Sequence, residues 1–181
     1  LQATASATNQ NAAQSDVDTM IADGLSYIVE GEASRDGETV EFSFHLPVAS
    51  RYYRCNNGVD QTRGIAIEAD KTTDAMIYAH ALHLFWDTLA AGDEDLRFDA
   101  FAAVAGEDGL VDEQELLDQD LTDLRDAEGE PLQDTDGHRV IYNSGSFLGP
   151  DELNLQAFFF YAARAGVHFN GVGFCLMERI D

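Results

Sequence analysis

Two histidines, His80 and His83, stand three positions apart in the run His80-Ala81-Leu82-His83-Leu84-Phe85-Trp86-Asp87. Imidazole nitrogens bind copper and zinc. On a straight strand these two side chains would face opposite sides, so they converge on one ion only if the backbone bends between them. The run lies where alternating apolar and polar residues give way to helical spacing, which predicts such a bend. The alternative is that both are hydrogen-bonded histidines in a packed corner.

A third histidine, His168, lies shortly before Cys175, and the only other cysteine is Cys55. Neither cysteine belongs to a Cys-x-x-Cys pair. In an exported protein the simplest interpretation is one disulfide between them, whereas in the cytosol both would be buried thiols. Because Cys55 precedes the strand that leads to His80, the disulfide would bring His168 back to that sheet.

These residues predict a site in which a transition metal, copper or zinc, is held by histidines. Its expected ligands are His80, His83 and His168. Asp87 would be the fourth ligand or would accept a hydrogen bond from a ring N–H. We therefore expect a metal-binding protein rather than an enzyme, since no nucleophile, phosphate loop or dinucleotide fingerprint is suggested by spacing.

The segment from 104 to 116 has the outline of a calcium loop. With Gly109 at the sixth position, three carboxylates fall at the fifth, ninth and twelfth: Asp108, Asp112 and Glu115. The first and third positions carry no side-chain oxygen, so a structural helix–loop–helix is favoured and calcium is the weaker alternative. A second acidic stretch, 134–138, is expected to be a solvated turn, with an adventitious cation site as the alternative.

The chain that must position these residues shows two kinds of periodicity. Residues 25–32 and 39–46 alternate around a turn at 34–37, which predicts a β-hairpin. Further strands are expected at 62–69 and 73–82, and helices at 83–90, 94–104, 112–118 and 154–166. The last segment also alternates like a strand, but its caps, Asn154 and Gly166, favour the helix. The predicted class is α+β: an N-terminal antiparallel sheet, sandwich-like, followed by a mainly helical second half and closed by one disulfide. No internal repeat or linker is visible, so 21–181 is expected to be one domain.

The composition sets limits on partners. There are 34 acidic and 10 basic residues, a net charge of −24. Such a charge repels nucleic acid and anionic membranes, and it suits either a saline habitat or ordinary exported proteins. No window is apolar enough to span a membrane.

The first twenty residues suggest a second hypothesis. The chain opens with Leu1 and continues as a small, polar, nearly uncharged segment, which is typical of sequence behind a removed export signal or an anchor. We therefore expect a secreted or cell-surface protein with a flexible or partner-held arm, 1–20. Such an arm could pair with the sheet edge of a neighbouring subunit in an extracellular filament or surface layer.

From about 55 to 175 the chain resembles a family of secreted bacterial proteins of uncharacterised function. That family shows His-x-x-His-Leu-Phe-aromatic-Asp, then an EF-hand-like loop ending in Glu-Leu, then Gly-His-x-x-Gly-x-Gly-His-Cys. The matching segments here are 80–87, 108–116 and 168–175.

Two departures from that pattern concern the last motif. Val167 precedes His168, and Phe174 stands where the family has a further histidine, so a fourth imidazole is absent. A looser similarity, confined to His-x-x-Gly and the terminal cysteine, is to the copper-binding partner proteins of methanobactin systems. Both resemblances imply a metal site that uses the three histidines.

Overall fold

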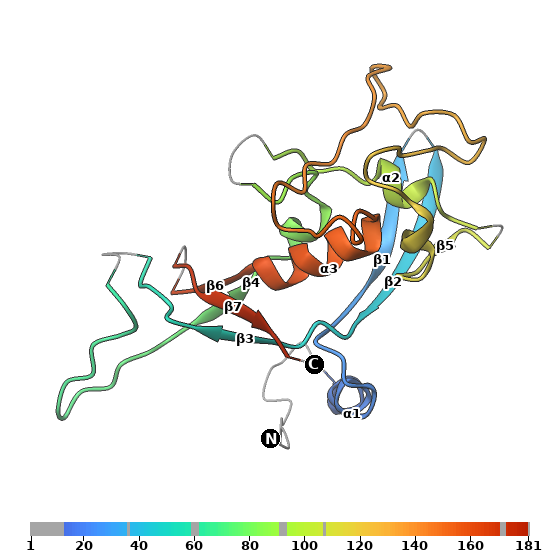
Figure 1. Cartoon of the computed structure of the whole chain (residues 1–181). Coiled ribbons are helices and arrows are strands. Elements are labelled where there is room, and N and C mark those ends of the chain that lie inside the picture. Colours follow the sequence, from blue (N-terminus) through green and yellow to red (C-terminus); the bar gives the residue numbers. More distant parts are fainter. Residues whose placement is uncertain are drawn as a thin grey trace.

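The structure is a computed structural model of the 181-residue chain, and it describes residues 13–35, 37–58, 62–90, 94–106, 108–170 and 173–180. Helices and strands both occur, as predicted for an α+β protein (Figure 1). The elements are α1 (Gln14–Asp23), β1 (Tyr27–Arg35), β2 (Glu38–Leu46), β3 (Ser50–Tyr53), β4 (Ile77–Ala79), η1 (Ala81–Phe85), α2 (Asp99–Ala102), β5 (Leu110–Val111), η2 (Glu115–Asp118), α3 (Leu155–Ala165), β6 (Val167–Phe169) and β7 (Leu176–Arg179).

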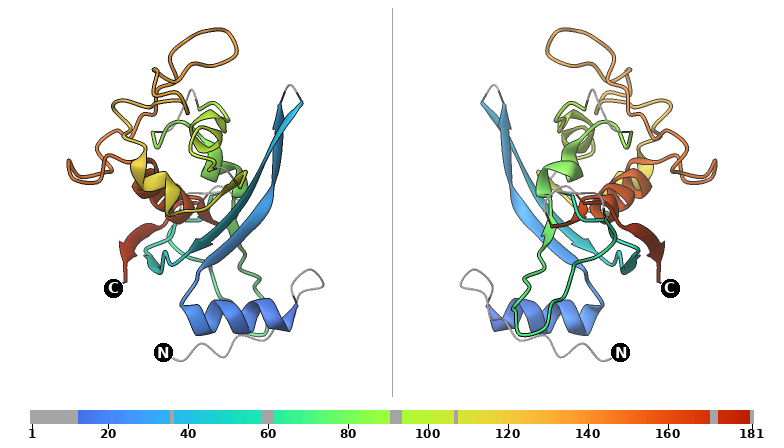
Figure 2. Two further views of the ribbon diagram at one scale, coloured as in Figure 1. Left: turned by 90° about the vertical axis from the view of Figure 1, so that its right-hand side faces the viewer. Right: turned by 90° about the vertical axis from the view of Figure 1, so that its left-hand side faces the viewer.

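The predicted N-terminal hairpin is confirmed. β1 and β2 pair antiparallel from Tyr27↔Leu46 to Arg35↔Glu38, and the short β5 adds to β2 in parallel. Figure 2 shows this sheet as a single curved layer with α2, α3 and the short helices η1 and η2 on one of its faces, while α1 lies beyond its lower end. The sandwich-like arrangement is therefore wrong: the apolar side chains of β2 are buried by helices and not by a second sheet.

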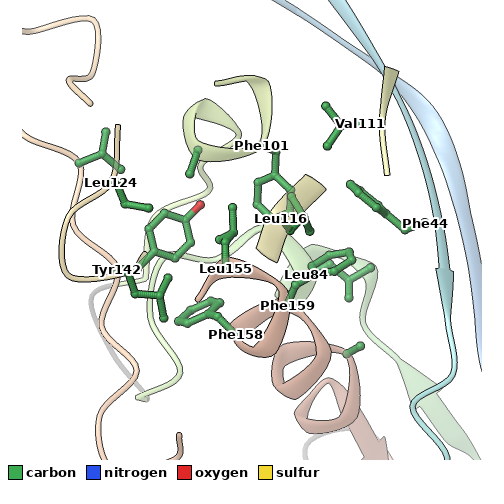
Figure 3. Packing of buried hydrophobic residues seen from close by; sticks show 14 of the residues in the cluster. Phe44, Leu84, Phe101, Val111, Leu116, Leu124, Tyr142, Leu155, Phe158 and Phe159 are labelled. Carbon is green, nitrogen blue, oxygen red and sulfur yellow. The ribbon is translucent and has the colours of Figure 1, made fainter. Parts of the chain in front are cut away.

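The main core lies between the hairpin and α3. Phe44 of β2 packs edge-on against Phe159 of α3 with ring centroids 4.7 Å apart, and Phe101 of α2 contacts both rings. Figure 3 shows Leu84 of η1 among these residues, and its exposed fraction is 5%. Because aromatic edge-to-face pairs add to the gain from burial, this cluster fixes α3 and η1 on the same sheet face.

The last predicted helix is also confirmed, with its caps. The Asn154 side chain accepts a hydrogen bond from the amide of Ala157, and Gly166 follows the last turn of α3. The side chains Leu155, Phe158 and Phe159 are fully buried, which is why an apolar segment that also alternates becomes a helix here.

The second half is not clearly mainly helical, which corrects the sequence-based expectation. The helices expected at 83–90, 94–104 and 112–118 shrink to η1, α2 and η2, of at most five residues each. Of the predicted strands, 73–82 contains only β4, and the described part of 62–69 contains none. Four short strands, β3, β5, β6 and β7, were not predicted, because two to four residues carry too little periodicity to be recognised.

The segment between η2 and α3 contains an eight-residue repeat, contrary to the expectation of none. Its apolar positions are Leu116, Leu124, Leu132, Val140 and Leu148. The amide of Leu132 bonds to the carbonyl of Leu124, and that of Val140 to Leu132, so successive repeats stack in register. All three of these side chains are buried.

Each of two repeats turns around an aspartate. Asp126 Oδ1 accepts the amides of Glu128 and Glu130, and Asp134 Oδ1 accepts those of Asp136 and His138. A glycine with positive φ completes each turn, Gly129 in the first and Gly137 in the second. Part of the acidic composition therefore forms turns, since aspartate side chains replace backbone acceptors there.

Residues 14–20 of the predicted arm belong to α1, which has no buried residue. The rest of that prediction, residues 1–12, lies outside the described residues. None of the helices in the described part of the chain combines the length and hydrophobicity needed to cross a membrane.

Leu132→Ala tests the stacked repeat. We expect a loss of about 2–5 kcal/mol in the free energy of unfolding, because the side chain is deleted from a packed interior. Ile141→Ala is the matched control, since Ile141 lies nearby but is 67% exposed, and it should cost less than about 0.5 kcal/mol. Equal losses in urea titrations of the two variants would contradict the stacking.

Candidate metal centre

A single turn of 3₁₀ helix brings His80 and His83 to the same side of the chain. β4 ends at Ala79, His80 keeps an extended conformation as the N-cap, and the amide of His83 bonds to the carbonyl of His80 at 3.1 Å. Side chains three residues apart eclipse one another in a 3₁₀ turn. The bend required for His-x-x-His to converge is therefore present.

His168 reaches the same place from the far end of the chain. It lies in β6, which pairs antiparallel with β4 so that His168 stands opposite Tyr78, two residues before His80. The amide of His80 bonds to the carbonyl of Gly166 at 2.9 Å, which continues the ladder to the end of α3. The histidines thus share one face of a two-stranded ribbon.

Gly166 permits this close approach. A Cβ at that position would stand 3.2 Å from the His80 carbonyl oxygen and 3.3 Å from the Cβ of His83. The absence of a side chain lets α3 end directly against the two histidines. Leu84, the residue after His83, is buried in the core and so fixes the position of the turn.

The predicted disulfide between Cys55 and Cys175 is confirmed. It joins the ends of β3 and β7, which pair antiparallel, and the amide of Asn56 bonds to the carbonyl of Phe174 at 2.8 Å. Gly173 lies where these two segments pack closely, since a Cβ at this position would stand 2.2 Å from the carbonyl oxygen of Asn56. The disulfide therefore holds the chain just beyond β6 against the segment that follows β3.

The three imidazole rings form a compact cluster. Their centroids are 5.1 Å apart for His80 and His83, 4.8 Å for His80 and His168, and 5.3 Å for His83 and His168. His80 is exposed, while His83 and His168 are partly buried. The cluster is thus accessible from one side.

Aromatic side chains surround the cluster. Trp86 stacks on His83 with centroids 3.7 Å apart and an angle of 26° between the rings, and Phe174 lies 5.5 Å from His168. Both ring nitrogens of His168 are buried without a hydrogen-bonding partner. A buried imidazole with neither nitrogen satisfied is costly, and coordination of an ion would satisfy one of them.

The environment keeps two rings neutral. Burial, and then the neighbouring His168 and His80, lower the pKa of His83 to about 4. Burial and the proximity of His80 also lower the pKa of His168. Neutral imidazole is the form that binds a metal ion, so protons compete weakly at this cluster.

The ring nitrogens are less well converged than the ring centres. Among described residues, only Asp134, Asp136 and His138 offer ligand atoms that all lie within 4.8 Å of one another. These residues belong to one turn, in which Asp136 and His138 are exposed. Asp134 already accepts two backbone amides there, and its Oδ2 lies 3.7 Å from Nη1 of Arg97. For the histidine cluster to bind an ion, the rings must turn about χ2, a torsion that is broad for histidine.

Asp87 does not face the histidines as a free carboxylate. One of its oxygens accepts the Nε–H of Arg97 at 2.7 Å, and the other accepts the amide of Asp95 at 3.1 Å. Its backbone carbonyl accepts the amide of Asn143. The structure therefore places Asp87 in the link between the segment after η1 and the eight-residue repeats.

The calcium candidates form caps around η2. Asp112 Oδ1 accepts the amides of Gln114 and Glu115, while Glu115 Oε2 accepts the amide of Asp112. Asp108 Oδ1 accepts the amide of Leu110. This is the reciprocal pattern of a capping box, which explains these carboxylates without an ion.

A cavity of about 430 Å³ opens beside the cluster. His83 and His168 line it together with Trp86, Tyr161 and Met177. Sequence reasoning did not find this cavity, because its lining comes from segments that are distant in the chain. An ion held by the histidines would have a free coordination position on this side.

Comparison of the chain with protein-family models, curated proteins and solved structures gave no match. The arrangement described above is therefore interpreted from its own geometry.

The depressed pKa of His83 predicts how the metal-free protein responds to acid. The unfolded chain takes up the proton near pH 6.5 and the folded chain only near pH 4, so stability contributed by this group is lost as the pH falls between these values. Urea titrations with a chelator present should show the stability of the wild type, relative to His83→Gln, falling across that window. A difference that stays constant from pH 6.5 to pH 4 would contradict the assignment.

Proposed function

We propose that the protein binds one transition-metal ion, copper or zinc, through His80, His83 and His168. The observation that carries the proposal is the clustering of three imidazoles from two distant segments, with both nitrogens of His168 buried and unsatisfied. Three imidazoles that oppose each other's protonation are an unusual group to bring together, and a shared ion gives a reason for it.

The spacing of the rings supports this proposal. A metal–nitrogen bond of about 2.0–2.1 Å places each ring centre roughly 3.2 Å from the ion, so that rings in a tetrahedral arrangement have centres about 5.2 Å apart. The three observed separations run from 4.8 to 5.3 Å. Binding would then require rotation of the rings but little movement of the backbone.

The surroundings favour a nitrogen-rich site that is open on one side. Asp87, the carboxylate that the sequence suggested as a ligand, is held by Arg97, and Glu94 acts on His83 only as the last of the causes of its pKa shift. Three histidines with an open position suit zinc or copper rather than calcium. The thioether of Met177 lines the adjoining cavity, which favours copper over zinc as the softer ion.

Metal content and affinity of the tag-free protein test the proposal. We expect one ion per chain. His80→Ala and His168→Ala should each weaken binding by at least about a hundredfold, because loss of a ligand lowers affinity more than loss of a residue that only hydrogen-bonds to a ligand. His45→Ala and His138→Ala are matched controls that should leave affinity unchanged. Binding that is lost with His138→Ala would move the site to the acidic turn, and no stoichiometric metal would refute the proposal.

Asp87→Asn separates a structural role from ligation. We expect the free energy of unfolding to fall by about 1–3 kcal/mol, because the charge-assisted bond to Arg97 is weakened in a partly buried position. Metal affinity, measured by competition with a chromophoric chelator, should change by less than about threefold. A loss comparable to that of His80→Ala would make Asp87 a ligand, as the sequence first suggested.

The disulfide is consistent with an oxidising compartment, and we infer that the protein works in the secreted or cell-surface space. The assembly hypothesis, in which an arm pairs with a neighbouring subunit, depends on residues 1–12, which lie outside the described part. It stays a prediction.

A further inference from the structure

Charge is distributed unevenly over the molecule. The histidine end, defined as the described residues within 48–86 and 164–180, contains β3, β4, η1, β6 and β7. It carries six of the ten basic residues and only four of the 34 acidic ones. Outside 48–86 and 164–180 the sequence carries four basic and 29 acidic residues. Figure 1 shows the four strands together at one end, with α2, β5 and the hairpin tip at the other.

Exposed apolar side chains gather at the same end. Of the fourteen large hydrophobic residues that are exposed in the described chain, nine belong to it: Tyr53, Ile67, Met76, Ile77, Tyr78, Leu82, Phe174, Leu176 and Ile180. Ile77 is 72% exposed and Phe174 64%. A concentration of this kind at one near-neutral end marks an interaction surface rather than scattered surface residues.

This end also presents an unprotected strand edge. Among the described strands, β4 pairs only with β6. The backbone groups of Met76 and His80 bond to residues at either end of β6. Because bonding direction alternates along a strand, the N–H and C=O groups of Ile77 and Ala79 point away from β6. In the described chain these outward groups have no backbone partner. No charged residue occurs from 75 to 86, so the edge lacks the charges and prolines that usually block pairing.

We propose that the histidine end is the dimerisation surface of this protein and that its occupant is a second copy of the chain. Two copies can approach closely only through this face, because everywhere else one strongly acidic surface would meet another. A twofold axis through Tyr78 would set Ile77 of one copy opposite Ala79 of the other, where their outward backbone groups can bond. The flanking apolar side chains would be buried around this strand pair.

The charge distribution gives the dimer a characteristic salt dependence. The acidic bodies on either side of the contact repel each other, and screening shortens from about 10 Å at 0.1 M salt to about 3 Å at 1 M. Sedimentation equilibrium of the full chain, with a chelator present, should therefore show a dimer that tightens as NaCl increases. A monomer at both salt concentrations and at all protein concentrations tested would overturn the proposal, and so would a dimer that weakens with salt.

Matched variants locate the contact. Ile77→Glu and Leu82→Glu should each raise the dimer dissociation constant at least about tenfold, because a charge would be buried without a partner. Ile141→Glu adds the same charge at a 67% exposed position on the acidic body and should change it less than about twofold. All three positions are exposed, so circular dichroism should confirm an unchanged fold. Equal effects of Ile77→Glu and Ile141→Glu would exclude this surface. The measurement does not depend on metal binding, so the two proposals can fail separately.

Discussion

The packing of α3 against the β1–β2 hairpin is the constraint on which the rest of the structure depends. Phe44 and Phe159 meet at its centre, and Leu84 of η1 enters the same cluster. Because η1 carries His83 and the end of α3 leads into β6, both histidine-bearing segments are fixed relative to one core. The pairing of β4 with β6 then sets their register.

The candidate site shows how weak local elements can be held precisely by their surroundings. β4 and β6 have three residues each, and an isolated two-stranded ribbon of that length is not stable in water. Here one end is closed by α3 and Gly166, and the other lies next to the disulfide between Cys55 and Cys175. The cluster can therefore keep imidazoles partly buried and neutral, which an unsupported ribbon could not do.

The acidity of the chain has two physical roles. Some carboxylates, such as those of Asp112, Asp126 and Asp134, accept backbone amides and determine turns. Others are exposed and give the body its large negative field. Their near absence from the histidine end leaves one face on which apolar contact with another molecule is not opposed by charge.

The sequence by itself determined the elements whose signals are local: the hairpin with its turn and the capped helix α3. For the two cysteines it left a disulfide or buried thiols open, depending on the compartment, and the tertiary structure brings them together as a disulfide. The sequence also identified the histidines as candidate ligands, but only the tertiary structure brings them together. The strands that do so, β3, β4, β6 and β7, are too short to show periodicity. Their pairing joins residues about a hundred positions apart. The partner of Asp87 was also decided by the fold, because Asp87 and Arg97 are ten residues apart and meet where their segments form the bridge between Trp86 and Leu96. The eight-residue repeat was not recognised in the sequence, because its period matches neither helix nor strand, and only the stacked hydrogen bonds show that it is a structural unit.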